Sequence, residues 1–183
     1  MTETRSREVA GTGGAGWGAT RSKTVQWHDP AITAAAGARL NGLEFLRAIL
    51  DGVLPPPPIA ALLGMQMREV EVGRVVFECE PDESAYNPMG VVHGGLVCTL
   101  ADTVAACAVH TTLGYGVAYT SIDLNVSYLR PVTVRSGVLR ATGLVTKLPG
   151  RRVAFSRAEI VDDAGKLVAT ATSSCLVMEG QTA

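Results

Sequence analysis

The sequence predicts an α+β domain in which an antiparallel sheet wraps around one buried helix. Three observations support this class. Residues 96–109 form a nearly unbroken apolar run, too long for a strand and apolar on all sides, which is typical of a buried helix. Two short strand-like segments precede this run, and a longer series of strand-like segments follows it. That order does not fit a parallel, doubly wound sheet.

A helical arm is predicted ahead of the sheet. Asp29 and Pro30 combine an N-cap residue with proline at the first helical position, so we expect a helix from about Pro30 to Leu50. The four prolines at 55–58 then predict a stiff polyproline II spacer. The predicted divisions are a disordered tail at 1–24, an arm with its linker at 25–58 and the main domain at 59–183.

The main domain contains strands with recognisable patterns. Strands are expected over 67–70 and 74–79, and a turn at 87–90 precedes the buried helix. After the helix, residues 121–128 alternate, with Ile122, Leu124, Val126 and Tyr128 on one face and Ser121, Asp123, Asn125 and Ser127 on the other. Further strands are expected over 132–147, 151–161 and 166–178, with a hairpin turn at 162–165.

The bulk properties exclude several classes of function. The chain has 183 residues, enough for one domain with a core, and its net charge of −1 gives no general attraction to nucleic acid or to an anionic membrane. The N-terminal segment lacks the apolar core of a signal peptide, and no apolar tract is long enough for a membrane span, so a cytoplasmic protein is expected. The four cysteines form no CxxC pair and the three histidines show no ligand spacing, so no metal site is expected.

Two features could carry chemistry. Gly94 and Gly95 stand just before the buried helix, where amides lack internal partners and carry the positive end of the helix dipole. An oxyanion stabiliser for acyl transfer needs such amides, although the two glycines could instead serve tight packing of the helix on the sheet. Asp102 lies inside the apolar run, where a carboxylate is either hydrogen-bonded for structure or active as a base or nucleophile.

Two neighbouring polar residues could have either a functional or a structural role. Asn87 could hold a carbonyl group or a water molecule, and His93 could donate a hydrogen bond to a ligand. Either could equally fix the loop in which it stands. The chain contains no P-loop, no dinucleotide fingerprint and no serine-hydrolase nucleophile elbow.

Residues 87–95, Asn-Pro-Met-Gly-Val-Val-His-Gly-Gly, followed by Leu100-Ala101-Asp102, resemble the signature of the PaaI-type acyl-CoA thioesterases of the hotdog fold. That signature is N-x-x-G-x-x-H-G-G with an acidic residue eight positions after the first glycine of the pair. The resemblance extends from about Ile59 to Met178 and includes the segments 123–126 and 128–131. It implies an enzyme that hydrolyses acyl-CoA to a carboxylic acid and coenzyme A.

The resemblance also implies residue roles. Asp102 is the expected base or nucleophile, and the amide of Gly94 is expected to polarise the thioester carbonyl. Asn87 would orient the carbonyl or the attacking water, His93 would support the loop, and Ser121 would help to position water. No metal or bound cofactor is implied, because coenzyme A arrives with the substrate. Similar proteins are homodimers, often joined into tetramers.

Two alternatives stand beside hydrolysis. A hydratase or dehydratase of the same fold needs a histidine paired with an acidic residue, whereas His93 is tied to the glycine pair. A non-catalytic module that binds acyl-CoA would not need Asp102. Hydrolysis therefore fits these residues best, while aromatic (phenylacetyl-like) and medium-chain acyl groups are both open.

Two expectations concern the substrate and the assembly. Between residues 130 and 166 basic side chains outnumber acidic ones, and we expect Arg130, Lys147, Arg151 and Arg152, with Gly95, to contact the coenzyme A portion. A solvated sheet face is the other explanation.

A helix rises about 1.5 Å per residue, so Asp102 lies roughly 12 Å from Gly94 along the axis. Both can act on one substrate only if a second chain supplies one of them, which predicts an active site shared within a homo-oligomer.

Overall fold

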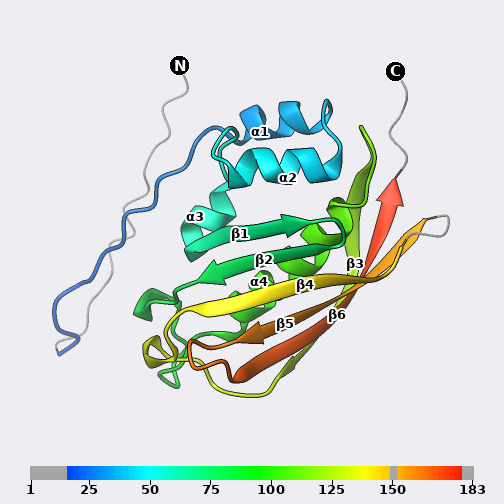
Figure 1. Cartoon of the computed structure of the whole chain (residues 1–183). Helices are drawn as coiled ribbons and strands as arrows, with labels where there is room; N and C mark the ends of the chain where they lie inside the picture. The colour runs from blue at the N-terminus through cyan, green and yellow to red at the C-terminus, as the bar shows by residue number, and fades with distance from the viewer. Residues whose placement is uncertain (1–15, 149–151, 179–183) are drawn as a thin grey trace.

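The computed structural model describes residues 16–148 and 152–178, and its centre is one antiparallel sheet (Figure 1). The strands lie in the order β1-β2-β4-β5-β6-β3, and every neighbouring pair is antiparallel. The helix α4 crosses the inner face of the sheet (Figure 1). The α+β class predicted from the sequence is confirmed. The strands are β1 (Met65–Glu71), β2 (Arg74–Cys79), β3 (Ala118–Tyr128), β4 (Leu139–Lys147), β5 (Val153–Val161) and β6 (Leu167–Met178).

The buried helix α4 (Gly94–His110) is a continuous α-helix of 17 residues, as its apolar run predicts. Its sheet-facing side chains, such as Leu100 and Val104, are fully buried. Gly143 on β4 allows this close packing, because a Cβ atom there would lie 2.0 Å from the carbonyl oxygen of Val104. The backbones of the helix and the sheet therefore meet directly at this point, and only glycine fits.

Three predictions on element boundaries were wrong. The arm is not one helix but two, α1 (Pro30–Gly37) and α2 (Gly42–Leu50), because Asn41 forms a capping box with Glu44 and starts a new helix. The last of the four prolines is not part of a spacer, since Pro58 begins the short helix α3 (Pro58–Leu63). The strand expected from 132 starts only at Leu139, because residues 134–136 form a 3₁₀ turn capped by Thr133.

The position of β3 is not predicted by its place in the chain. β3 follows α4 but pairs with β6 at the far edge of the sheet, while β4 lies beside β2. The chain therefore crosses from one side of the sheet to the other between β3 and β4. This crossing leaves β3 as an edge strand that runs beside α4 (Figure 1).

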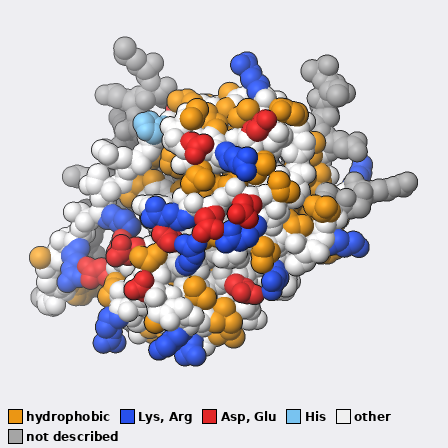
Figure 2. Space-filling model, viewed as in Figure 1, with side chains coloured by type: hydrophobic (Ala, Val, Ile, Leu, Met, Phe, Trp, Pro, Cys, Tyr) orange, Lys and Arg blue, Asp and Glu red, His pale blue; other side chains and the backbone are white. Residues whose placement is uncertain are grey.

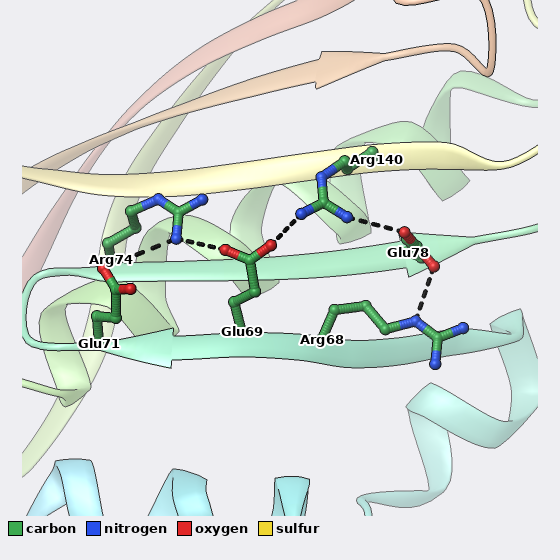
Figure 3. Close-up of polar contacts among 6 residues, drawn as sticks. All are labelled: Arg68, Glu69, Glu71, Arg74, Glu78 and Arg140. Carbon is green, nitrogen blue, oxygen red and sulfur yellow. Dashed lines mark hydrogen bonds and ion pairs between the residues drawn. The ribbon is translucent and has the colours of Figure 1, made fainter.

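The outer face of β1, β2 and β4 carries an alternating network of ion pairs (Figures 2 and 3). Arg140 contacts both Glu69 and Glu78, Arg74 donates to Glu69 at 2.6 Å, and Arg68 donates to Glu78 at 2.7 Å. Hydrogen bonds from these arginines lower the pKa of both glutamates. Val76 lies between Arg74 and Glu78 on this face yet is fully buried, so the network shields an apolar side chain from water.

The segment before the arm contacts the main domain. Residues 16–29 have no regular secondary structure, but Arg21 pairs with Glu83 and Lys23 donates to Asp82 at 2.6 Å. The hydrogen bond from Lys23 holds the pKa of Asp82 at about 2. The first 15 residues of the predicted tail lie outside the described residues. Within the described part of the chain, no helix is both long and apolar enough to cross a membrane.

Candidate active site

The N-terminus of α4 presents one free amide. His93 caps the helix, and its Nδ1 accepts a 2.8 Å hydrogen bond from the amide of Gly95. Among residues 16–148 and 152–178, the amide of Gly94 has no acceptor. Because Nδ1 of His93 accepts, a neutral imidazole carries its proton on Nε2 and can donate outward. Gly94, and not Gly95, therefore offers an amide to a ligand at the positive end of the helix.

Tyr128 defines one side of this helix end. Its hydroxyl donates a 3.1 Å hydrogen bond to the carbonyl of Gly94, and a Cβ atom at Gly94 would lie 3.2 Å from its ring. Gly94 therefore also serves the close packing of the helix on the sheet, the alternative role expected for the glycine pair, because it leaves room for this ring. Tyr128 was not among the predicted site residues. The sequence feature that could have identified Tyr128 is its position at the end of the alternating strand, two residues before Arg130.

Asn87 lies in the loop before α4, as its turn pattern predicts. Its Oδ1 accepts hydrogen bonds from the amides of Met89 at 2.9 Å and Val91 at 3.4 Å. Gly90 closes the turn onto the carbonyl of Asn87 with a positive φ of 77°. The side-chain oxygen thus holds the loop, and within the described residues the Nδ2 group has no partner and can donate to a ligand.

Asp102 and Ser121 form the second cluster. The Ser121 hydroxyl donates to Oδ1 of Asp102 at 2.8 Å, and both side chains are half-buried. The strand alternation predicted from the sequence places Ser121 on the opposite face from Leu124 and Val126, and this prediction was wrong. The register of β3 against β6 shifts between Ser121 and Asp123, so the extra residue Ile122 points outward. This bulge turns Ser121 toward α4.

The groups around Asp102 are neutral at pH 7. Burial, together with the charge of Asp102, raises the pKa of Cys107 to about 12. Burial and the neighbouring thiols, with Asp102, also raise the pKa of Tyr119. Burial raises the pKa of Cys175. No cation neutralises Asp102 in the hydrogen bonds and ion pairs of the described residues, which leaves its charge available for chemistry.

The predicted basic residues do not lie together within one chain. Arg130 follows the end of β3 beside Val168, whereas Lys147 ends β4 and Arg152 lies beside Val177 at the other end of the sheet. Arg151 lies outside the described residues. Two other basic residues of the stretch are occupied, since Arg140 binds two glutamates and Arg157 pairs with Glu159 at 2.9 Å. In the described ranges, no three His, Cys, Asp or Glu residues cluster in a way that could hold a metal ion.

The comparisons with known proteins decide the family. The model of the thioesterase superfamily matches residues 89–169. Human acyl-coenzyme A thioesterase 13 is 30% identical over 128 residues, which cover 69% of this chain and 89% of that protein. This chain belongs to the thioesterase superfamily. The resemblance stated from the motif at 87–102 is thereby confirmed, and the chain is a thioesterase.

The solved structures of thioesterase relatives share its fold. A phenylacetic acid degradation-related protein from Ralstonia eutropha JMP134 is 35% identical with a TM-score of 0.65, and the match covers 71% of this chain and 97% of that one. The PaaI protein of E. coli is 24% identical with a TM-score of 0.66, a likeness of fold that covers 76% and 95% of the two chains. The hotdog fold implied by the resemblance is confirmed. The superfamily match begins at Met89, so the helical arm precedes it.

Proposed function

We propose that this thioesterase hydrolyses acyl-CoA to a carboxylic acid and coenzyme A, with Asp102 as the base or nucleophile. The observation that carries the proposal is the pairing of two half-sites on one helix. The first half-site is the free amide of Gly94 with Asn87, and the second is Asp102 with Ser121. The names of relatives such as acyl-coenzyme A thioesterase 13 support the class of substrate.

The first half-site suits the thioester carbonyl. The amide of Gly94 points out of the positive end of α4 and can stabilise the oxyanion that forms when the carbonyl is attacked. The Nδ2 group of Asn87 is a second donor, because its Oδ1 is held by the loop amides of Met89 and Val91. The amide of Gly95 binds His93, so the role of Gly95 is to support the cap rather than to touch the substrate.

The second half-site suits the attack. Ser121 donates to one oxygen of the Asp102 carboxylate, and among the residues that the structure describes the other oxygen accepts no hydrogen bond. As a base, that oxygen takes a proton from water while the water oxygen bonds to the carbonyl carbon. The carbon–sulfur bond then breaks, and the proton passes to the leaving thiolate. As a nucleophile, a carboxylate oxygen of Asp102 would bond to the carbonyl carbon and expel the coenzyme A thiolate. Water would then cleave the resulting anhydride to the free acid and restore the carboxylate.

The two half-sites meet only between two chains. Because α4 is one unbroken helix, eight residues separate Gly94 from Asp102 by about 12 Å along its axis. The carbonyl must lie about 3 Å from the amide and at a similar distance from the base, which one chain cannot provide. A second copy related by a two-fold axis supplies the missing half-site and creates two equal sites.

We infer the position of that axis from two residues of β3 that contact α4. Ser121 lies beside Asp102, and Tyr128 lies beside Gly94. An axis near Cys98, midway between Gly94 and Asp102, also passes near the midpoint of 121–128 on β3. β3 is an edge strand, and no other strand of the described residues pairs with its outer side, so it can pair with its own copy. This arrangement also brings Arg130 of one chain toward Lys147 and Arg152 of the other, which makes a composite site for the phosphates of coenzyme A.

Mixed dimers test the shared site. Asp102→Asn alone should cut turnover by about 100-fold or more while the fold is kept, and Asn87→Ala should also be inactive. A dimer that combines one chain of each variant has one site with both lesions and one intact site. Verified hybrids should therefore recover about half the native activity per dimer.

Three outcomes would contradict the proposal. Hybrids without recovered activity, or a fully active monomer in sedimentation and assay, would rule out the shared site. An Asp102→Asn chain with near-native turnover would rule out the role of Asp102. A chain that binds acyl-CoA but releases no free thiol from any member of a substrate panel would indicate a binding module instead of an enzyme.

A further inference from the structure

A cavity of about 410 Å³ lies between the helical arm and the main domain. Its outer wall comes from α2, α3 and the prolines between them, and its inner wall comes from β1, β2 and α4. The outer wall includes Ile49 and Ala60, and the inner wall includes Met65 and Phe77. A cavity of this volume is in the usual range for small-molecule sites.

The cavity lies close to the Asp102–Ser121 pair, although neither of these two residues lines it. Thr103, the residue after Asp102, lines it, and so does Cys107 one turn further along α4. Tyr119 also lines it and lies two residues before Ser121 on the inward face of β3. From Thr103 to His110 the cavity follows α4 for about 10 Å. It is therefore elongated and leads away from the carboxylate toward the C-terminal end of the helix.

The walls of the cavity are mostly apolar and carry no charged side chain. None of its lining residues is Lys, Arg, Asp or Glu. His110 lines the cavity at the C-terminal end of α4, and the centre of its ring lies 5.3 Å from that of Phe45 and 4.8 Å from that of Tyr119. Burial lowers the pKa of His110 to about 4, so this histidine is neutral at pH 7. An acyl group with a second carboxylate would find no cation here.

We propose that this cavity binds the aliphatic chain of the acyl group and that the helical arm, as its outer wall, sets the preferred chain length. The proposal rests on the proposed role of Asp102, because the thioester must lie at the mouth of the cavity. An uncharged, mostly apolar space that follows α4 suits several methylene groups in a row. The arm precedes the residues matched by the superfamily model, so this chain supplies the wall from its own N-terminal extension.

Two opposite changes in the wall test the proposal. Ala60→Phe fills the cavity from α3, and Ile49→Ala enlarges it from α2. Ala35→Phe is the matched control, because Ala35 is exposed on α1 and does not line the cavity. Each variant is assayed with acetyl-, hexanoyl-, decanoyl- and phenylacetyl-CoA, and folding is checked by circular dichroism.

In the native chain, kcat/KM should rise by about fourfold per methylene until the cavity is filled. Ala60→Phe should lower kcat/KM for decanoyl-CoA by at least about tenfold and leave kcat/KM for acetyl-CoA unchanged. Ile49→Ala should move the optimum to longer chains, and Ala35→Phe should match the native profile. If Ala60→Phe does not fold, Ile49→Ala alone decides the matter. A native preference for phenylacetyl-CoA over every aliphatic substrate, or an unchanged profile in the folded wall variants, would overturn the proposal.

A binding measurement separates this proposal from the catalytic one. Non-hydrolysable S-ethyl- and S-decyl-CoA thioethers are titrated into the Asp102→Asn chain by calorimetry. Tighter binding of S-decyl-CoA that Ala60→Phe removes would support the cavity even if Asp102 proved dispensable for turnover. Equal affinity for both thioethers in a chain whose native form hydrolyses acyl-CoA would overturn the cavity and leave the proposed function standing.

Discussion

The Ser121 hydroxyl donates a 2.8 Å hydrogen bond to Oδ1 of Asp102 and so joins the edge strand β3 to the middle of α4. The bond depends on one extra residue, because Ile122 bulges out of the β3–β6 pairing and lets Ser121 face the helix. Bulges of this kind often re-aim a side chain beside an active site. The carboxylate is thereby held by a strand that also forms the free edge of the sheet.

Ser121→Ala should lower kcat by about tenfold or more, because a hydrogen bond to a charged group is worth about 1.5–3 kcal/mol. The change should affect KM little, since Ser121 contacts the carboxylate rather than the acyl chain. Ser121→Thr keeps the hydroxyl and should restore most of the rate. Ser127→Ala, on the exposed face of β3, is the control and should be silent in a steady-state assay of thiol release.

Arg152→Ala should raise KM for acyl-CoA more than it lowers kcat, because the guanidinium group is proposed to pair with phosphate. The substitution should change KM little for an acyl-pantetheine thioester, because this substrate lacks the nucleotide phosphates. Arg157→Ala is the matched control, since Arg157 is also exposed but already pairs with Glu159. Equal losses on both substrates, or the same effect from Arg157→Ala, would contradict the phosphate assignment.

Gly143→Ala should destabilise the fold by about 3 kcal/mol, the upper range for overpacking a core, because its Cβ would overlap the carbonyl of Val104. Gly114→Ala provides the comparison, since nothing lies within 4 Å of a Cβ at Gly114 and its φ is not positive. Chemical denaturation should show a lower midpoint for the first variant and a native-like or higher midpoint for the second.

The buried His110 should make the fold acid-sensitive. Its pKa falls from an ordinary value of 6.5 to about 4 because of burial, so between these values the unfolded chain binds more protons than the folded one. The free energy of unfolding should therefore decrease as pH falls from about 6.5 toward 4. His110→Gln should flatten the dependence between about pH 5 and 7, where few carboxylates titrate. His28→Gln, at an exposed position, should leave the native slope unchanged in urea denaturation at several pH values.

The elements that the sequence by itself determined are those with strong local signals. The apolar run predicts α4 to within two residues at each end, and the turn at Asn87–Gly90 forms as its residues indicate. The motif from Asn87 to Asp102 also identified the thioesterase superfamily. Hydrophobic periodicity and turn chemistry act over a few residues, so they can be recognised without knowing what packs where.

Only the tertiary structure decided how the site is assembled. The bulge at Ile122 reversed the predicted face of Ser121, and the pairing of β3 with β6 made β3 an edge strand. The ion pairs of Arg140 and the cavity under the arm join segments far apart in the chain. Each of these features is determined by contacts between residues that are distant in the sequence. Such contacts override local strand and helix preferences. The sequence therefore names the reacting groups, while the fold determines which of them face one another.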